Sequence, residues 1–183
     1  MTLIRIFLGP FAGKAHVGWF ALHLLMIVGL TALTQLGGIA YWLVVGVARS
    51  YKRPLVGWLV FAILYAAITV AIAPRLAPTF GRIALPCFTG LALQPASPLF
   101  CALNRHYVRP AAAAVADDVA RAVAREYPGS RVAYLDGSFP FLDWLPILPH
   151  LTHDDGRKLD LARIRFNPGR ILRQRRSSRI RWA

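Results

Sequence analysis

The residues best suited to chemistry lie close together in the stretch 150–161, which reads HLTHDDGRKLDL. His153 and Asp160 supply an imidazole and a carboxylate, and both groups are zinc ligands in proteins. Gly156 lies between them, and a glycine lets the chain turn so that both side chains can approach one ion. On their own, a histidine and an aspartate seven residues apart are weak evidence for a zinc site.

The full pattern His-x-x-Gly-Arg-x-x-Asp-Leu, which begins at His153, resembles the zinc-binding segment of a metallopeptidase superfamily. That superfamily includes D-alanyl-D-alanine carboxypeptidases and dipeptidases, lysostaphin-type enzymes and the hedgehog signalling domain. The resemblance implies that His153 and Asp160 are the first two zinc ligands, that Gly156 forms the turn, and that Arg157 is structural or orients the ligands from outside the coordination shell. It also implies an activity on cell-wall peptides that contain D-amino acids.

The sequence departs from that superfamily after the second ligand. A later histidine normally completes the site, commonly preceded by an acid that activates the metal-bound water, which gives three protein ligands and an open position. No histidine, aspartate or glutamate follows Asp160. His150 is an alternative third ligand, although Pro149 and the three-residue spacing from His153 disfavour that geometry. We therefore expect an incomplete zinc site, no catalytic residue and little or no peptidase activity from this chain.

Two acids, Asp154 and Asp155, directly follow His153. They could orient its imidazole from outside the coordination shell, or they could form a solvated acidic turn. The solvated turn is the simpler interpretation.

The charge of +14 is concentrated at the end of the sequence, because eight arginines and no acid follow residue 160. Residues 162–183 show no apolar period, so we expect an irregular, unstructured basic tail. One interpretation is a shifted reading frame or a truncation of a longer metallopeptidase-like protein. The other is a native polybasic tail that binds anionic lipid, to which each cation near a membrane contributes about 1 kcal/mol. Nucleic acid is not an expected partner.

The first part of the chain is a predicted membrane anchor, residues 1–75. The sequence is 56% hydrophobic and only 16% charged, which excludes a disordered or coiled-coil protein. Two uncharged runs predict two transmembrane helices, near residues 18–47 and 55–73. The first run exceeds one bilayer crossing but is too short for two, so it predicts one long helix with a bend at Gly37-Gly38.

The loop between these runs contains Arg49, Lys52 and Arg53 and no acid. Short loops rich in cations stay in the cytoplasm, so both termini are expected on the opposite side. The prediction is a multi-pass protein of the inner (cytoplasmic) membrane with an extracytoplasmic C-terminal domain, in contact with membrane lipid and possible peptidoglycan peptides.

The segment 76–110 is rich in proline and glycine and is expected to be a connector. It contains Cys87 and Cys101, fourteen residues apart. They could form a disulfide, whose loop closure would stabilise the fold by about 3 kcal/mol, or remain two buried thiols.

The predicted metallopeptidase-like segment, residues 111–161, begins with an amphipathic helix over Ala111–Glu126. Val115, Val119 and Val123 lie on one face of that helix. A strand over Arg131–Leu135, the turn pair Asp136-Gly137 and an apolar loop over 139–149 follow. The aromatic residues of this loop could fill a core or line a cleft.

The expected fold class is therefore two N-terminal transmembrane α-helices, a small, incomplete α+β extracytoplasmic domain and an irregular basic tail. The expected function is that of a membrane-anchored zinc D-Ala-D-Ala-peptidase-like protein that is inactive in this chain. The alternative is a non-enzymatic integral membrane protein whose outer domain or basic tail binds a partner or an anionic surface.

Overall fold

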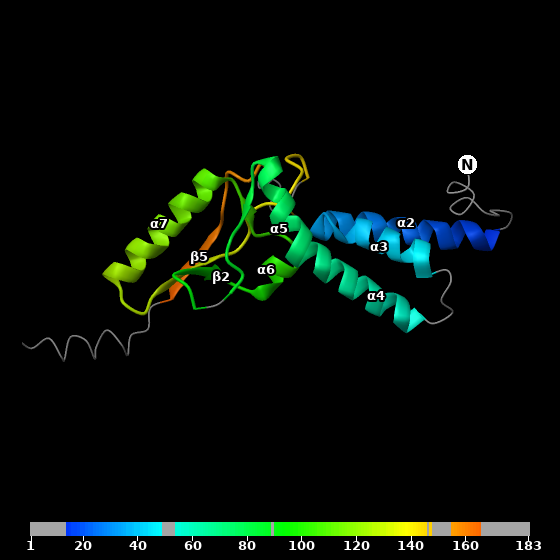
Figure 1. Ribbon diagram of the computed structural model, residues 1–183, viewed down its shortest axis with the longest axis horizontal. Helices are drawn as coiled ribbons and strands as arrows, with labels where there is room; N and C mark the ends of the chain where they lie inside the picture. The colour runs from blue at the N-terminus through cyan, green and yellow to red at the C-terminus, as the bar shows by residue number, and fades with distance from the viewer. Residues whose placement is uncertain (1–13, 49–53, 89, 146, 148–154, 166–183) are drawn as a thin grey trace, which may run out of the picture. The chain divides into compact units, whose positions relative to one another are not determined.

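The computed structural model describes residues 14–48, 54–88, 90–145, 147 and 155–165 (Figure 1). The chain divides into two compact units, Met1–Arg75 and Leu76–Ala183.

In the first unit, two apolar helices form a hairpin. They are α2 (Lys14–Thr34) and α3 (Gly37–Ala48), which lie side by side (Figure 1). The Tyr41 hydroxyl and His23 Nδ1 are hydrogen-bonded at 2.8 Å. In one straight helix these residues would be about 27 Å apart at 1.5 Å per residue, so the chain must reverse between them.

The prediction of one long helix over residues 18–47 is therefore wrong, and the break lies before Gly37. Gln35 adopts a left-handed conformation with φ of 64°. The Thr34 hydroxyl donates to the Leu30 carbonyl and accepts from the Gly37 amide, both at 2.8 Å, so it caps α3 while it remains bonded to α2. These two residues end α2 and start α3.

Gly38 is needed because α3 starts very close to α2, and not because a single helix bends there. A Cβ at this position would lie 1.9 Å from Thr31 Oγ1 and 2.5 Å from the Ile27 carbonyl oxygen. Only glycine lets the start of α3 approach α2 this closely.

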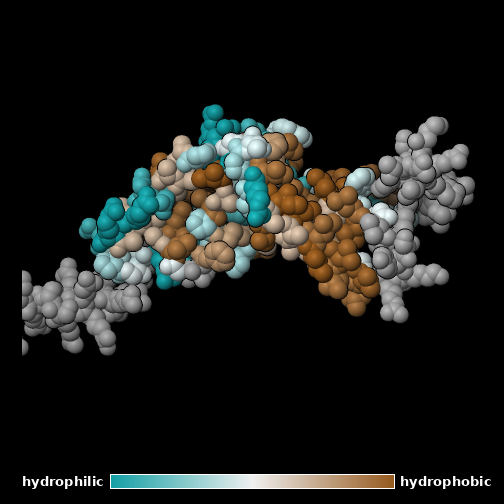
Figure 2. All heavy atoms as spheres, viewed as in Figure 1, coloured by the Kyte–Doolittle hydropathy of each residue, from teal (hydrophilic) through white to brown (hydrophobic). Residues whose placement is uncertain are grey.

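Within the described residues, one helix is long and apolar enough to cross a membrane, Leu55–Phe80, with 26 residues. Its apolar window has no buried residue, and Val70 is 76% exposed. Figure 2 shows that the surface residues of the helices in the first unit are mostly hydrophobic. The apolar parts of α2 and α3 are shorter, so the described part of the chain supports one membrane-crossing helix rather than the two predicted.

This helix changes its winding as it approaches Pro74. It begins as α4 (Pro54–Ala67), continues through a π segment (Ile68–Ile72) into α5 (Ala73–Leu76), and ends in a 3₁₀ turn (Ala77–Phe80). A proline lacks the amide hydrogen and its ring clashes with the carbonyl one turn earlier, and a widened π turn relieves that clash. The helix therefore continues past the end predicted at residue 73.

In the part of the chain that the structure describes, the second unit contains two α-helices and five short strands. They are, in chain order, β1 (Ile83–Ala84), β2 (Leu93–Pro95), α6 (Pro98–Ala102), β3 (Tyr107–Val108), α7 (Pro110–Glu126), β4 (Arg131–Tyr134) and β5 (Leu161–Arg165). Three of the strands form a sheet of order β2-β4-β5, in which β2 runs parallel to β4 and β5 runs antiparallel to β4. Helix α7 packs on β2 and β4, and β1 and β3 form a separate two-stranded antiparallel sheet.

Helix α7 and strand β4 confirm the predicted helix and strand to within one residue at either end. The expected connector, 76–110, instead contributes β1, β2, α6 and β3 to the folded unit. Residues 162–165, expected in the irregular tail, belong to β5. These strands are two to five residues long, and so short a strand has no hydrophobic period of its own.

The valines expected on one face of α7, here called the valine stripe (Val115, Val119 and Val123), do not form its buried face. Ala113, Ala116 and Ala120 are buried against the sheet, whereas Val115 is 63% and Val119 is 41% exposed. Residues four apart on an α-helix are offset by about 40°, so the stripe winds toward the core along the helix. Accordingly Val123, the last valine, packs against the core.

Candidate metal-binding segment

The predicted turn at Gly156 is present and is tightly enclosed. Gly156 is buried and has a φ of +71°, in the left-handed region that favours glycine. Its carbonyl accepts a 2.8 Å hydrogen bond from the Arg109 amide. A Cβ here would lie 3.1 Å from Ser138 Oγ and 3.3 Å from Arg82 Nε. The conformation therefore favours glycine, and a methyl group here would crowd Ser138 and Arg82.

The residues on either side of Gly156 close the turn. The Arg157 amide donates to Asp155 Oδ1 at 2.9 Å, and Arg157 Nε lies 3.9 Å from Asp155 Oδ2. The amide bond, followed by nearby cations, lowers the pKa of the Asp155 carboxyl. Of the two roles considered for Asp155, this geometry matches a carboxylate that closes a turn.

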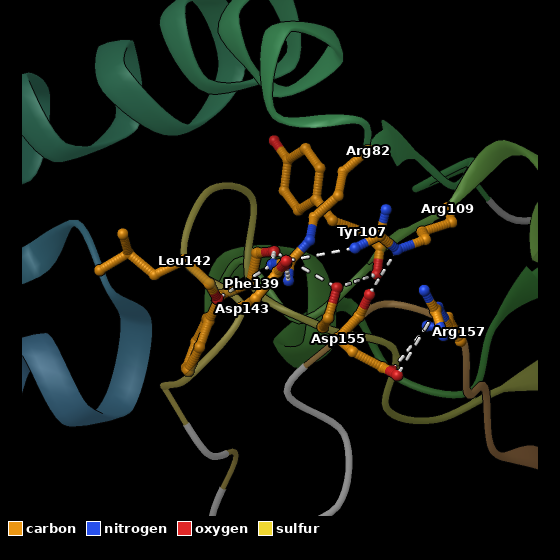
Figure 3. A network of polar contacts seen from close by, with 9 residues as sticks. Arg82, Tyr107, Arg109, Phe139, Leu142, Asp143, Asp155 and Arg157 are labelled. Atoms are coloured by element: carbon orange, nitrogen blue, oxygen red, sulfur yellow. Dashed lines mark hydrogen bonds and ion pairs between the residues drawn. The ribbon is translucent and has the colours of Figure 1, made fainter.

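Two arginines lie beside this turn and bind the apolar loop after Ser138 (Figure 3). Arg109 Nε donates to the Asp155 carbonyl at 2.9 Å, and its Nη2 lies 3.2 Å from Asp143 Oδ2. The buried Arg82 guanidinium donates to the Phe139 carbonyl, to the Leu142 carbonyl at 3.3 Å and to Asp143.

Burial lowers the pKa of Arg82, and the Asp143 carboxylate opposes that shift. The guanidinium therefore bridges loop carbonyls and a carboxylate in a region largely removed from water. It ties the loop after Ser138 to the segment that precedes β1.

Asp160, the second predicted ligand, is fixed through its backbone to the end of β4. Its amide donates to the Asp136 carbonyl at 3.0 Å, and its carbonyl accepts from the Leu135 amide at 2.8 Å. Asp136 is itself buried beside Arg105, with 3.5 Å between the carboxylate and the guanidinium. The segment from the Gly156 turn to Asp160 is therefore anchored at both ends.

His153, the first predicted ligand, lies outside the described residues, as do His150 and Asp154. The structure brings together Asp155, Gly156 and Arg157 in one turn and places Asp160 just before β5. Whether an imidazole and the Asp160 carboxylate converge stays a prediction.

A separate group of possible ligands surrounds the two cysteines. Cys87 and Cys101 form a disulfide, which was one of the two alternatives considered for them. The His106 side chain offers a nitrogen within 4.8 Å of both sulfur atoms. The three residues lie close enough to hold a metal ion, but in this structure both sulfurs are engaged in the disulfide.

Sequence reasoning had found the cysteines but not His106, Arg82, Arg109 or Asp143. The signal in the sequence was an isolated charged residue or histidine within a mostly apolar stretch, as at Arg82 in TFGRIALP. Such a residue inside a core must find a partner, but the sequence does not say which one.

A shallow groove of about 520 Å³ runs between α7 and the segment that leads to β5. Val115, Val119, Leu159 and Leu161 give it apolar walls, and Arg109 and Arg157 also line it. The exposed valines of α7, Val115 and Val119, therefore line one side of a concave surface.

Comparisons with known protein families, with curated proteins and with solved structures find no match for this chain.

Proposed function

We propose that this chain is a membrane-anchored, zinc-binding protein of the D-Ala-D-Ala-peptidase type, directed at cell-wall peptides. The single observation that carries the proposal is the enclosed left-handed Gly156 turn, at the position where the nine-residue pattern needs one. A turn held by the backbone and side chain of Arg109 keeps the following segment in one conformation, as a metal ligand requires.

The residues that would hold zinc are His153 and Asp160. The anchored backbone of Asp160 suits this role, because a ligand on a fixed segment loses little conformational entropy on binding. Zinc, when bound, polarises a carbonyl group and lowers the pKa of a bound water molecule. Two protein ligands leave several coordination positions to water, so we expect weak binding.

Hydrolysis also needs a group that takes the proton from the attacking water. The sequence offers no acid after Asp160 for that task. We therefore propose that this chain binds zinc and a peptide but turns over little or no substrate.

The proposed anchoring is supported by the Leu55–Phe80 helix, which has the length and composition of a membrane span. We place the second unit outside the cytoplasm because Arg49, Lys52 and Arg53 favour the cytoplasm for the preceding loop. The Cys87–Cys101 disulfide supports the same side, since disulfides persist in oxidising compartments. An inner membrane next to peptidoglycan fits these properties.

The test is zinc affinity of the full chain in detergent micelles, measured for the wild type, His153→Ala and Asp160→Ala. We expect each substitution to weaken binding by more than the roughly 10- to 100-fold lost when an outer-shell partner is removed. Asp117→Ala is the matched control, because Asp117 pairs with Arg121 on the exposed face of α7.

Unchanged affinity in both ligand variants would overturn the zinc proposal and favour the alternative, a membrane protein that binds a partner without catalysis. The same preparations should show little hydrolysis of D-alanyl-D-alanine. Robust zinc-dependent turnover by the wild-type chain would contradict the proposed inactivity and reveal a third ligand.

A further inference from the structure

The Cys87, Cys101 and His106 side chains form a compact group at the edge of the second unit. Cys101 lies in α6, and the residues that follow this helix lead to His106. The Leu85 amide donates to the His106 carbonyl at 2.8 Å, which holds the chain before Cys87 beside the histidine. The potential ligand atoms lie within 4.8 Å of one another. The backbone therefore fixes all three residues around one point.

His106 is 4% exposed, and its Nδ1 has no hydrogen-bond partner in the part of the chain that the structure describes. A buried ring nitrogen without a partner is unusual, because leaving a buried polar group unsatisfied costs about 1–3 kcal/mol. Burial also keeps this imidazole neutral near pH 7, and the neutral form is the one that binds metals. The histidine is thus prepared for a ligand that the disulfide state does not supply.

We propose that Cys87 and Cys101 form a redox switch, in which reduction converts the disulfide into a zinc site completed by His106. A dithiol reductant donates two electrons and two protons to the Cys87–Cys101 bond and becomes a disulfide itself. Zinc then binds the two sulfurs as thiolates, with release of two protons, and takes the neutral nitrogen of His106 as its third ligand. In the reverse step a disulfide oxidant accepts two electrons from the two thiolates and becomes a dithiol, the Cys87–Cys101 bond forms again and the ion is released.

The space around the cysteines allows this exchange. Three ligands on a tetrahedral zinc ion lie about 3.5–3.8 Å apart, given Zn–S bonds near 2.3 Å and Zn–N bonds near 2.0–2.1 Å. The group already lies within 4.8 Å, and both cysteines are partly exposed, so small side-chain movements are enough. Thiolate ligands also favour zinc over magnesium or calcium.

The fourth coordination position would belong to solvent. The Tyr134 hydroxyl lies 3.4 Å from Cys101 Sγ, and it donates to the Pro86 carbonyl at 2.8 Å. Burial raises the pKa of Tyr134, so this hydroxyl stays protonated and is a poor zinc ligand. The site would therefore have two sulfurs, one nitrogen and an open position.

The experiment uses the full chain in detergent, carrying Asp160→Ala so that the site proposed above does not contribute. Cobalt(II), a spectroscopic substitute for zinc, is added to the oxidised and the reduced protein, and thiolate-to-cobalt charge-transfer absorption is recorded. We expect one equivalent of cobalt to produce this absorption in the reduced protein alone, and zinc to displace it. If the reduced protein with both cysteines intact shows no charge-transfer band, the proposal is overturned.

His106→Gln tests the third ligand, and Cys87→Ser with Cys101→Ser tests the sulfurs. We expect His106→Gln to weaken zinc binding by more than 10-fold and the double serine variant to abolish the charge-transfer band. Equal affinity in the reduced wild type and His106→Gln would overturn the three-ligand site.

Thermal melting provides a readout that does not depend on cobalt. Zinc should raise the melting temperature of the reduced protein and leave the oxidised protein unchanged, because only the reduced folded state has the site. If zinc fails to stabilise the reduced chain, the proposal is wrong whatever the spectra show.

Discussion

Each of the two units of this protein is stabilised internally by a different kind of interaction. The helices of the first unit meet through apolar surfaces and a few hydrogen bonds, such as the one between His23 and Tyr41. Their outward faces are apolar, as expected for a surface that meets lipid. The second unit instead contains a disulfide, a buried arginine and an enclosed glycine turn. Reduction of the disulfide and substitution of buried polar residues should therefore destabilise the second unit and leave the hairpin of the first unit unchanged.

Replacing Arg82 should give the largest effect. Arg82→Met removes a buried donor from the Phe139 and Leu142 carbonyls and one of the two arginine partners of Asp143, so we expect a loss of about 3–4 kcal/mol from the stability of the second unit. Hydrogen exchange followed by mass spectrometry measures the two units separately. Exchange should increase in the second unit only.

Arg121→Met is the control for this experiment, because Arg121 pairs with Asp117 and Asp118 on the exposed face of α7. We expect no measurable change in exchange. Equal exchange in the two variants would contradict a structural role for the Arg82 bridge.

Acid should destabilise the second unit through His106. Burial lowers the pKa of His106 from its ordinary 6.5 to about 4, so the folded chain binds this proton more weakly than the unfolded chain. The stability contributed by the neutral ring is therefore present above about pH 6.5 and is lost as the pH falls toward 4. The expected loss across this interval is about 3 kcal/mol for the oxidised, zinc-free protein.

The measurement is the melting temperature of the second unit between pH 7 and pH 4. His106→Gln lacks the titrating ring, so the difference between the two chains isolates this histidine from the other ionisable groups. Parallel curves for the wild type and His106→Gln would show that the ring does not titrate differently in the folded state.

Gly156→Ala should destabilise the second unit by about 2 kcal/mol, because alanine is strained at positive φ and its methyl group would crowd Ser138 and Arg82. Chemical denaturation with a fluorescence readout measures the change. Gly90→Ala is a useful comparison, since Gly90 also has positive φ but has open space around its Cβ position. A loss no larger at Gly156 than at Gly90 would show that enclosure contributes nothing.

Gly38→Ala should affect the first unit alone and have the smallest effect, about 1–2 kcal/mol. The methyl group would overlap Thr31 and push α3 away from α2. The distance between spin labels placed on the two helices should increase. Gly29→Ala, on α2 with open space around its Cβ position, should leave that distance unchanged.

The sequence predicted the parts of the fold that have a local pattern. Helix formers after Pro110 and a turn pair after Leu135 were enough to locate α7 and β4. The hairpin in the first unit was missed because a uniformly apolar run has no period, and its reversal depends on Thr34, Gln35 and the room at Gly38.

The candidate site divides in the same way. The Gly156 turn could be predicted because the requirement for glycine is local. The bonds from Arg82 to the loop at Phe139, and the position of His106 beside the cysteines, join residues far apart in the chain. Nothing in a short window of sequence specifies such a partner.

The parallel pairing of β2 with β4 has a consequence for folding kinetics. Leu93 pairs with Val132, and the whole of α7 lies between them in the chain. A non-local contact forms only after the intervening loop has closed. Strand β2 can therefore pair with β4 only after the chain through α7 and β4 is present. During synthesis or translocation this strand would emerge first and remain without its neighbour. Chaperone capture of such chains should therefore fall sharply once residues through β4 have emerged.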